Sequence, residues 1–166
     1  MIRPVRQWPD QILLTPCNTW NHAQPPIDSL QLNQDLLDTL NATNAIGLAA
    51  NQIGICYRVL IIRSAEYSEH ITMYNPIVIE ASTTQWIHAE GCLSFPDIEL
   101  TISRPMTITV NWQDETGNLH TRSFKEIDAK CILHEIDHLD GLVFKQYVSN
   151  LKFLQAQKKA KKFKKS

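Results

Sequence analysis

Hydrophobic residues recur along this chain with two periods, one typical of helices and one typical of strands. Near the start, a leucine repeat at helical spacing follows Asp28, which suits an N-cap, and Gln31 stands where it would complete a capping box. This pattern predicts a first helix from about Ser29 to Ala42, with its apolar stripe in the core. The repeat consists of Leu32, Leu36, Leu37 and Leu40.

The middle of the chain changes to short runs with strand-like alternation. The clearest run alternates apolar residues on one face, and the segment Asp114 to Asn118 after it contains Gly117 and predicts a hairpin turn. Asn75-Pro76 interrupts an earlier run. The expected strands are Tyr57–Arg63, Ile71–Glu80, Met106–Gln113 and Leu119–Phe124.

Two more helices are expected near the end. Ser123 and Glu126 form a second capping box, which predicts a helix from about Phe124 to Asp140 that stops at Gly141. A last amphipathic helix near Ser149 would make 149–166 a C-terminal helix with a basic tail. Strands in the middle with helices at both ends predict an α+β fold. We expect antiparallel or mixed sheets around the central helix, with an N-terminal and a C-terminal helix, in one domain spanning 1–166.

Composition and charge fit an ordinary globular domain. The chain of 166 residues is 43% hydrophobic and 20% charged, which excludes a disordered protein. The net charge of −1 conceals an asymmetry, because six of the 16 basic residues are lysines in the last nine positions. The remaining 10 basic residues stand against 17 acidic ones, so the body carries −7. The tail is either a solvated helix end or a segment that binds a polyanion such as ribosomal RNA.

Cysteine use and hydropathy suggest a reducing compartment. Four cysteines are scattered without paired spacing, so we expect core residues or metal ligands and not disulfides. The first residues hold no apolar run of signal-peptide length, and no stretch approaches the length of a membrane span. We therefore expect a cytoplasmic protein, although an organelle-matrix protein that has lost its transit peptide would look the same.

The strongest chemical signal lies in the helix expected from Phe124, in the run His134-Glu135-Ile136-Asp137-His138. Histidines four residues apart lie on one helical face and can bind one metal ion. Glu135 lies about 100° round the helix, where it can exchange protons with water at that metal. The alternative, two buried imidazoles without a metal, would be costly. The run therefore favours a hydrolytic metal site.

Such a site needs a third protein ligand and an open position. Metalloproteases of two classes take it from a downstream glutamate or histidine, and neither residue type follows His138. The ligand must lie upstream, where Cys92 in Glu90-Gly91-Cys92-Leu93-Ser94-Phe95-Pro96 is the best candidate. We expect Pro96 to end that strand-like run. His88 is a rival ligand, and Cys92 has the alternative of being a small core residue.

Three motifs then occur in a fixed order: Gly47-Leu48-Ala49-Ala50-Asn51-Gln52, Glu90-Gly91-Cys92-Leu93-Ser94 and His134-Glu135-Ile136-Asp137-His138-Leu139. Together they resemble the motifs of the peptide deformylase family, GxGxAAxQ, EGCLS and HExxH. The Trp8-Pro9-Asp10 start and the Asn75-Pro76 pair also fit. The resemblance covers nearly the whole chain, and three motifs in register are far more specific than one.

The resemblance implies a metal-dependent hydrolase that removes the N-formyl group from the first methionine of nascent proteins and releases formate. The metal ligands would be Cys92, His134 and His138, and the metal would be one divalent ion. The family favours iron(II), and a thiolate ligand is also compatible with zinc, nickel or cobalt. Glu135 would carry protons.

The resemblance also implies how the substrate is held. The side-chain amide of Gln52 and the backbone N–H of Leu93 would donate to the oxyanion. An apolar pocket would take the methionine side chain, with its walls at Ile46, Gly47, Leu48, Cys131 and the near face of His134.

The chain departs from the usual family pattern near the expected site. Ala45 replaces a glycine, and Leu133 replaces a common glutamine that offers a hydrogen bond behind the metal ligands. Asn44 and Glu99 stand where some bacterial members carry an acidic and a basic residue. We expect these changes to affect peptide preference and rate. Arg104 either pairs with Glu90 and braces the cysteine segment or is a surface residue.

Two other functions stay open at this stage. The chain could be a deformylase-like paralogue with altered peptide specificity, or a mainly ribosome-binding protein that docks through Lys158–Ser166. An endopeptidase is disfavoured by the missing downstream ligand. Nothing in the sequence requires more than a monomer.

Overall fold

The computed structural model of the chain describes residues 1–163, and this part contains three α-helices, seven strands and three short 3-10 turns. The helices are α1 (Ser29–Asn41), α2 (Glu126–Leu139) and α3 (Asn150–Phe163). The strands are β1 (Gly47–Ala49), β2 (Val59–Ser64), β3 (Glu69–Ala81), β4 (Gln85–Cys92), β5 (Phe95–Pro105), β6 (Thr107–Gln113) and β7 (Leu119–Lys125). The 3-10 turns are Gln11–Leu14, Ala50–Ile53 and Phe144–Tyr147.

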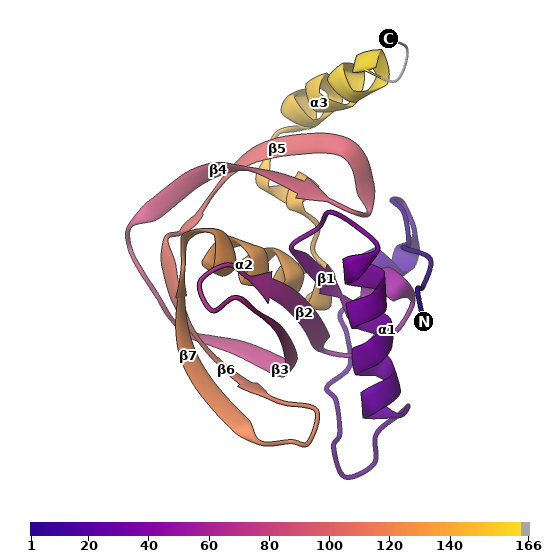
Figure 1. Cartoon of the computed structure of the whole chain (residues 1–166). Coiled ribbons are helices and arrows are strands. Elements are labelled where there is room, and N and C mark those ends of the chain that lie inside the picture. Colours follow the sequence, from indigo (N-terminus) through magenta and orange to yellow (C-terminus); the bar gives the residue numbers. More distant parts are fainter. Residues whose placement is uncertain (164–166) are drawn as a thin grey trace.

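The strands form two antiparallel sheets. One has five strands in the order β1-β2-β3-β6-β7, and the other is the hairpin β4-β5. Helix α2 lies between the two sheets, and it contacts β1 and β2 on one side and β5 on the other (Figure 1). The expected α+β fold around a central helix is therefore confirmed. The arrangement brings the end of β4 toward the buried face of α2.

The first helix forms as the leucine repeat predicts. Leu32, Leu36 and Leu40 are fully buried, and the Asp28 carboxylate accepts a hydrogen bond from the Gln31 N–H at 2.7 Å. The second hydrogen bond of the expected capping box, from the Asp28 N–H to the Gln31 side chain, does not form, because that side chain donates to Asp35 instead. The α1 helix ends at Asn41, one residue before the predicted end.

The second expected capping box is wrong. Strand β7 stays paired with β6 through Lys125, so Ser123 belongs to the sheet, and its hydroxyl contacts that of Thr109 at 3.0 Å. Helix α2 begins at Glu126 without a side-chain cap. Ile127, four residues before the buried Cys131 on this helix, is 38% exposed. Cross-strand pairing has prevailed over the local capping pattern.

The expectation that Pro96 ends a strand is also wrong. β4 ends at Cys92, the chain turns sharply with Cys92 opposite Phe95, and Pro96 is the second residue of β5. The inner face of β5 is Leu100, Ile102 and the charged Arg104, all buried. Because Arg104 is charged, the alternation of apolar and polar residues that marks a strand is hard to recognise in the sequence here.

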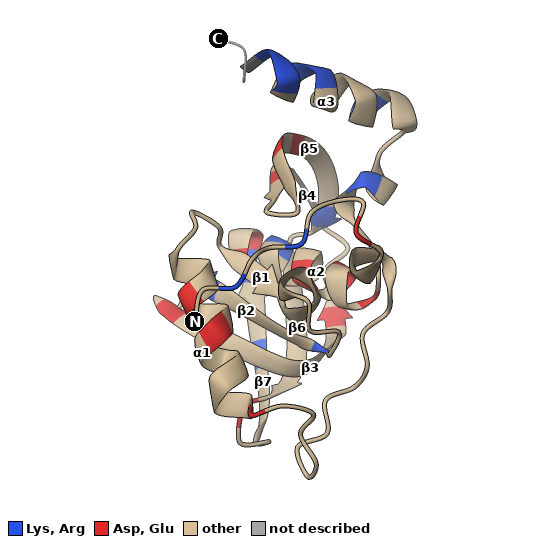
Figure 2. Ribbon diagram, turned by 90° about the vertical axis from the view of Figure 1, so that its right-hand side faces the viewer, with Lys and Arg blue, Asp and Glu red and all other residues tan. Residues whose placement is uncertain are grey.

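Helix α3 lies against β5 at the edge of the molecule (Figure 2). Phe153 is buried, whereas Leu151 and Leu154 are 66% and 52% exposed. No helix within residues 1–163 is long and apolar enough to cross a membrane. Two lysines of the predicted basic tail, Lys164 and Lys165, lie outside the described residues.

Candidate metal centre and catalytic cleft

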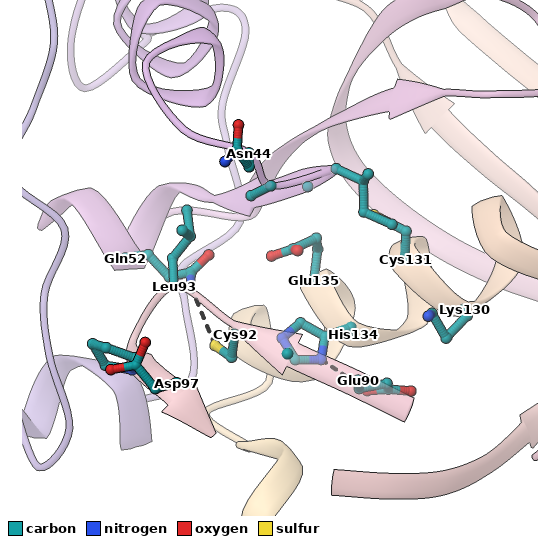
Figure 3. A pocket seen from close by; sticks show the side chains of 15 residues that line it. Asn44, Gln52, Glu90, Cys92, Leu93, Asp97, Lys130, Cys131, His134 and Glu135 are labelled. Carbon is teal, nitrogen blue, oxygen red and sulfur yellow. Dashed lines mark hydrogen bonds and ion pairs between the residues drawn. The ribbon is translucent and has the colours of Figure 1, made fainter. Parts of the chain in front are cut away.

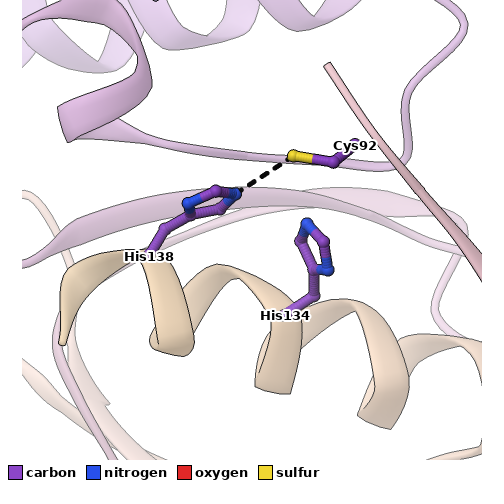
Figure 4. Close-up of side chains that lie close together, drawn as sticks. All are labelled: Cys92, His134 and His138. Carbon is purple, nitrogen blue, oxygen red and sulfur yellow. Dashed lines mark hydrogen bonds between the residues drawn. The ribbon is translucent and has the colours of Figure 1, made fainter. Parts of the chain in front are cut away.

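Cys92, His134 and His138 converge at the junction of β4 and α2 (Figure 4). Their ligand atoms all lie within 4.8 Å of one another, and Cys92 Sγ is 3.3 Å from His138 Nε2. The two histidines are 7% and 1% exposed, and they project from successive turns of α2. One soft sulfur and two imidazole nitrogens form a donor set that suits a divalent transition metal ion.

A buried carboxylate orients the first histidine. Glu90 Oε2 lies 2.9 Å from His134 Nδ1, which leaves Nε2 of that ring as the nitrogen available to a metal. Burial opposes ionisation of Glu90, yet hydrogen bonds from His134 and Arg104 lower the pKa of its carboxyl to about 2. A charged carboxylate behind a ligating imidazole is the usual outer support of a protein metal site. The residues therefore fit a metal ion.

Arg104 completes this support from β5. Its guanidinium donates to both Glu90 oxygens, at 2.5 and 3.0 Å, and to Asp137 at 2.9 Å. Arg104 is 4% exposed, so the alternative of a surface arginine is wrong. The bracing role that the sequence suggested is the one the geometry supports.

Replacing Arg104 by methionine is expected to lower the free energy of unfolding by about 3–5 kcal/mol, because Glu90 would be left buried without its cation. Urea denaturation of the metal-free protein measures this. Lys125→Met is the control, since Lys125 forms an exposed pair with Glu66 at 3.6 Å and should lose less than about 1 kcal/mol. Equal losses in the two variants would contradict the bracing role.

Glu135 lies beside the ligands in an unusual environment. It is 4% exposed, and its Oε2 has no hydrogen-bond partner within residues 1–163. Burial raises the pKa of Glu135 to about 7. A carboxyl group with a pKa near neutrality can both accept and donate a proton.

The backbone of β1 comes unusually close to Glu135. A Cβ atom added to Gly47 would lie 2.6 Å from Glu135 Oε1 and 2.5 Å from Cys131 Sγ. A methyl group at this position would have to displace these two side chains, so glycine lets the backbone pack directly against the carboxyl group.

Gln52 is buried with its amide held in one orientation. The Ala49 N–H donates to its Oε1 at 2.9 Å, so Nε2 faces Ser94 Oγ at 3.1 Å and Cys92 Sγ at 3.7 Å. The preceding Asn51 donates to the carbonyl of His138 at 2.6 Å. The first motif is thereby tied to the helix that carries the histidines.

These groups open onto a cavity of about 510 Å³ (Figure 3). Most of the residues expected from the sequence line it: Ile46, Gly47, Gln52, Cys92, Leu93, Cys131, His134 and Glu135. Leu48 does not, because its side chain is fully buried in the core cluster that contains Leu36 and Ile61. His138 lies deeper, behind the cavity wall, at 1% exposure.

Other candidates take different places. His88 is exposed and contacts the Ala89 carbonyl, so it is not part of the cluster with Cys92. Asn44 lines the cavity, whereas Glu99 lines an adjacent one of about 470 Å³. Sequence reasoning missed Lys130 in the wall. Its position four residues before His134, on the same helical face, was the available signal.

Comparison with known proteins agrees with this geometry. The family model for polypeptide deformylase matches residues 2–153. The peptide deformylase of Rhizobium meliloti (strain 1021) is 36% identical over 157 residues, which cover 91% of this chain and 87% of that protein. That of Prochlorococcus marinus (strain NATL1A) is 36% identical over 165 residues, covering 98% and 81%.

Solved structures show the same fold. A peptide deformylase from Legionella pneumophila superposes with a TM-score of 0.89 at 30% identity and covers 99% of this chain and 96% of its own. A Met-Ala-Ser-bound class I type b peptide deformylase from Acinetobacter baumannii gives 0.82 at 27% identity, covering 89% and 99%. Because the family model covers most of the chain and the relatives align over almost its whole length, the chain belongs to the peptide deformylase family of enzymes.

Proposed function

We propose that this enzyme removes the formyl group from N-formyl-methionyl peptides with one divalent metal ion held by Cys92, His134 and His138. The convergence of these three ligands beside a buried Glu135 is the observation that carries the proposal. When bound, the metal ion supplies Lewis-acid activation of water near neutral pH. The thiolate ligand is compatible with iron(II), and the family resemblance favours that ion over zinc, nickel or cobalt.

The chain's own groups have distinct tasks in this proposal. Glu135, with its pKa near neutrality, takes a proton from water and passes it to the leaving amine. The Gln52 amide is held with Nε2 toward Cys92. From there it donates a hydrogen bond to the formyl oxygen as negative charge develops on that oxygen. The N–H of Leu93 is the second donor. One chain supplies every group, so a monomer suffices.

The cavity walls hold the substrate in place. Ile46, Gly47 and Cys131 form an apolar wall beside Glu135 and accept the first side chain of the peptide. Leu48 supports this wall from the core and does not touch the substrate with its side chain.

Gly47→Ala is expected to lower kcat about a hundredfold, because the new methyl group would push Glu135 out of position. Formate release at saturating peptide measures the loss. Metal content should stay at one ion per chain, since Gly47 touches no proposed ligand. An unchanged kcat would show that catalysis does not depend on the position that the Glu135 carboxyl group has in the structure.

The direct test of the function is formate release from formyl-Met-Ala-Ser by oxygen-protected, fully metallated protein. We expect turnover of the formylated peptide and no cleavage of unformylated peptides, which separates a deformylase from an endopeptidase. Release at the uncatalysed rate would refute the proposal.

We further propose that α3 docks on a polyanionic partner such as ribosomal RNA. Lys158, Lys159, Lys161 and Lys162 cluster on its last turns, where the ribbon in Figure 2 is blue. Leu151 and Leu154 are exposed on its earlier turns. Deleting residues 158–166 should remove salt-dependent ribosome binding and leave turnover of short peptides intact. Binding that survives the deletion would contradict this docking role.

A further inference from the structure

The wall of the catalytic cavity contains a buried cation that the proposed mechanism does not use. Lys130 of α2 lines the cavity and is only 8% exposed. Trp86 of β4 covers its ammonium group, with the ring centre 5.7 Å from Nζ. Buried lysines normally have a carboxylate partner, because an unpaired charge out of water is costly. Within residues 1–163, Lys130 forms no ion pair at 4.0 Å or less.

The hydrogen bonds of Lys130 do not use all of its donors. Nζ donates to the Ala89 carbonyl at 3.1 Å and lies 3.3 Å from His88 Nδ1. The same Nδ1 lies 2.8 Å from the Ala89 carbonyl, so a tautomer that donates there cannot also accept from Lys130. An ammonium group has three N–H donors, and at least one is left for a ligand.

The position of Lys130 defines what can reach it. It precedes His134 by four residues, so its Cα lies about 6 Å closer to the N-terminal end of the helix than that of His134. In Figure 3, Lys130 lies beyond His134 and Cys131 as seen from Cys92, with Leu93 and Asp97 toward the opposite side. Because Lys130, Cys92 and His134 line one cavity, a peptide bound at the cysteine–histidine cluster can extend its first side chain toward Lys130.

The neighbouring charges favour a neutral partner over an anion. Glu90 and Glu135 line the same cavity, and Glu90 forms a 2.5 Å ion pair with Arg104. A third carboxylate would lie among these two acids, whereas a neutral oxygen accepts from the ammonium group without that repulsion.

We propose that Lys130 is a specificity-determining residue that donates a hydrogen bond to a neutral acceptor oxygen at the end of the first side chain of the formyl peptide. This inference rests on the proposed function. The substrate class is formyl peptides whose first residue ends in a sulfoxide or carboxamide oxygen, namely methionine sulfoxide or glutamine. Both side chains extend about as far as that of methionine. Their oxygen is a strong hydrogen-bond acceptor for Lys130, whereas the thioether sulfur of methionine is a weak one.

The test compares kcat/KM for X-Ala-Ser peptides in which X is formyl-methionine, formyl-norleucine, formyl-methionine sulfoxide or formyl-glutamine. Norleucine matches methionine in shape and has no acceptor. The preference is the ratio of kcat/KM for an acceptor-bearing peptide to kcat/KM for the norleucine peptide. We expect this ratio to be roughly tenfold to a hundredfold larger in the wild type than in Lys130→Met. Lys130→Arg should retain most of the preference, and Lys152→Met, at an exposed site on α3, should retain all of it.

The outcomes are distinct. Equal preferences in wild type and Lys130→Met would overturn the inference, as would an equal loss for all four peptides, which a purely structural lysine would cause. If only one of the two oxygen-bearing peptides is favoured, that peptide identifies the acceptor. Failure of the wild type on formyl-methionine would refute the proposed function instead. In that case, calorimetric binding of methionine sulfoxide-Ala-Ser against norleucine-Ala-Ser makes the same comparison without turnover.

Discussion

Glu135→Gln is expected to lower kcat for formate release about a thousandfold while one metal ion per chain stays bound. Positioned acid–base groups contribute about 10²- to 10⁴-fold. Glu135 is buried beside the metal ligands, and the pKa of its carboxyl group lies near neutrality. Its Oε2 has no protein partner within the described chain. Glutamine keeps the shape of the side chain and cannot exchange the proton.

Two measurements separate loss of chemistry from loss of structure in this variant. Metal analysis should give the wild-type stoichiometry, because Glu135 is not among the ligands. Glu80→Gln, the same change at an exposed position of β3, should leave kcat unchanged. A Glu135→Gln enzyme with more than about a tenth of wild-type kcat would show that another group moves the proton.

Cys92→Ala is expected to weaken metal binding by more than about a hundredfold, the size of loss that even outer partners of a metal site can cause. Cys92 Sγ lies at 3.3 Å from His138 Nε2 and 3.7 Å from Gln52 Nε2, so its removal opens one corner of the cluster. Formate release should fall with metal content. Equilibrium dialysis against a chelator of known affinity measures the binding constant.

Cys56→Ser is the matched control for this variant. Cys56 is a free, partly exposed thiol whose sulfur lies near Cys17, away from the cavity. Metal affinity and formate release should match the wild type. Retention of tightly bound metal by Cys92→Ala would mean that the ion has other ligands.

The site was largely predictable from the sequence because its chemistry is concentrated in short motifs. His134 and His138 are related by helical spacing alone, and elimination of downstream residues directed attention to Cys92. Their convergence requires the β4-β5 hairpin to fold onto α2, which the sequence pattern around Pro96 concealed. The resemblance to a family supplied that long-range contact.

The parts that could not be predicted depend on tertiary contacts. The sequence leaves Arg104 either as a partner of Glu90 or as a surface residue, and only the fold decides, because Glu90 and Asp137 meet the buried Arg104 from two other elements. Leu48 follows Gly47 in a strand, and alternation sends its side chain to the core while the neighbouring backbone faces the cavity. Ser123 resembles a helix cap in the sequence because its strand pairing with β6 leaves no local signal.

X-ray absorption at the edge of the bound metal tests the central claim most directly. Protein loaded with one equivalent of zinc should show one sulfur at about 2.3 Å and two imidazole nitrogens at about 2.0–2.1 Å. The sulfur contribution should vanish in Cys92→Ala and persist in Cys56→Ser. A wild-type spectrum with only nitrogen and oxygen neighbours would contradict the assignment of Cys92, His134 and His138 as one metal centre.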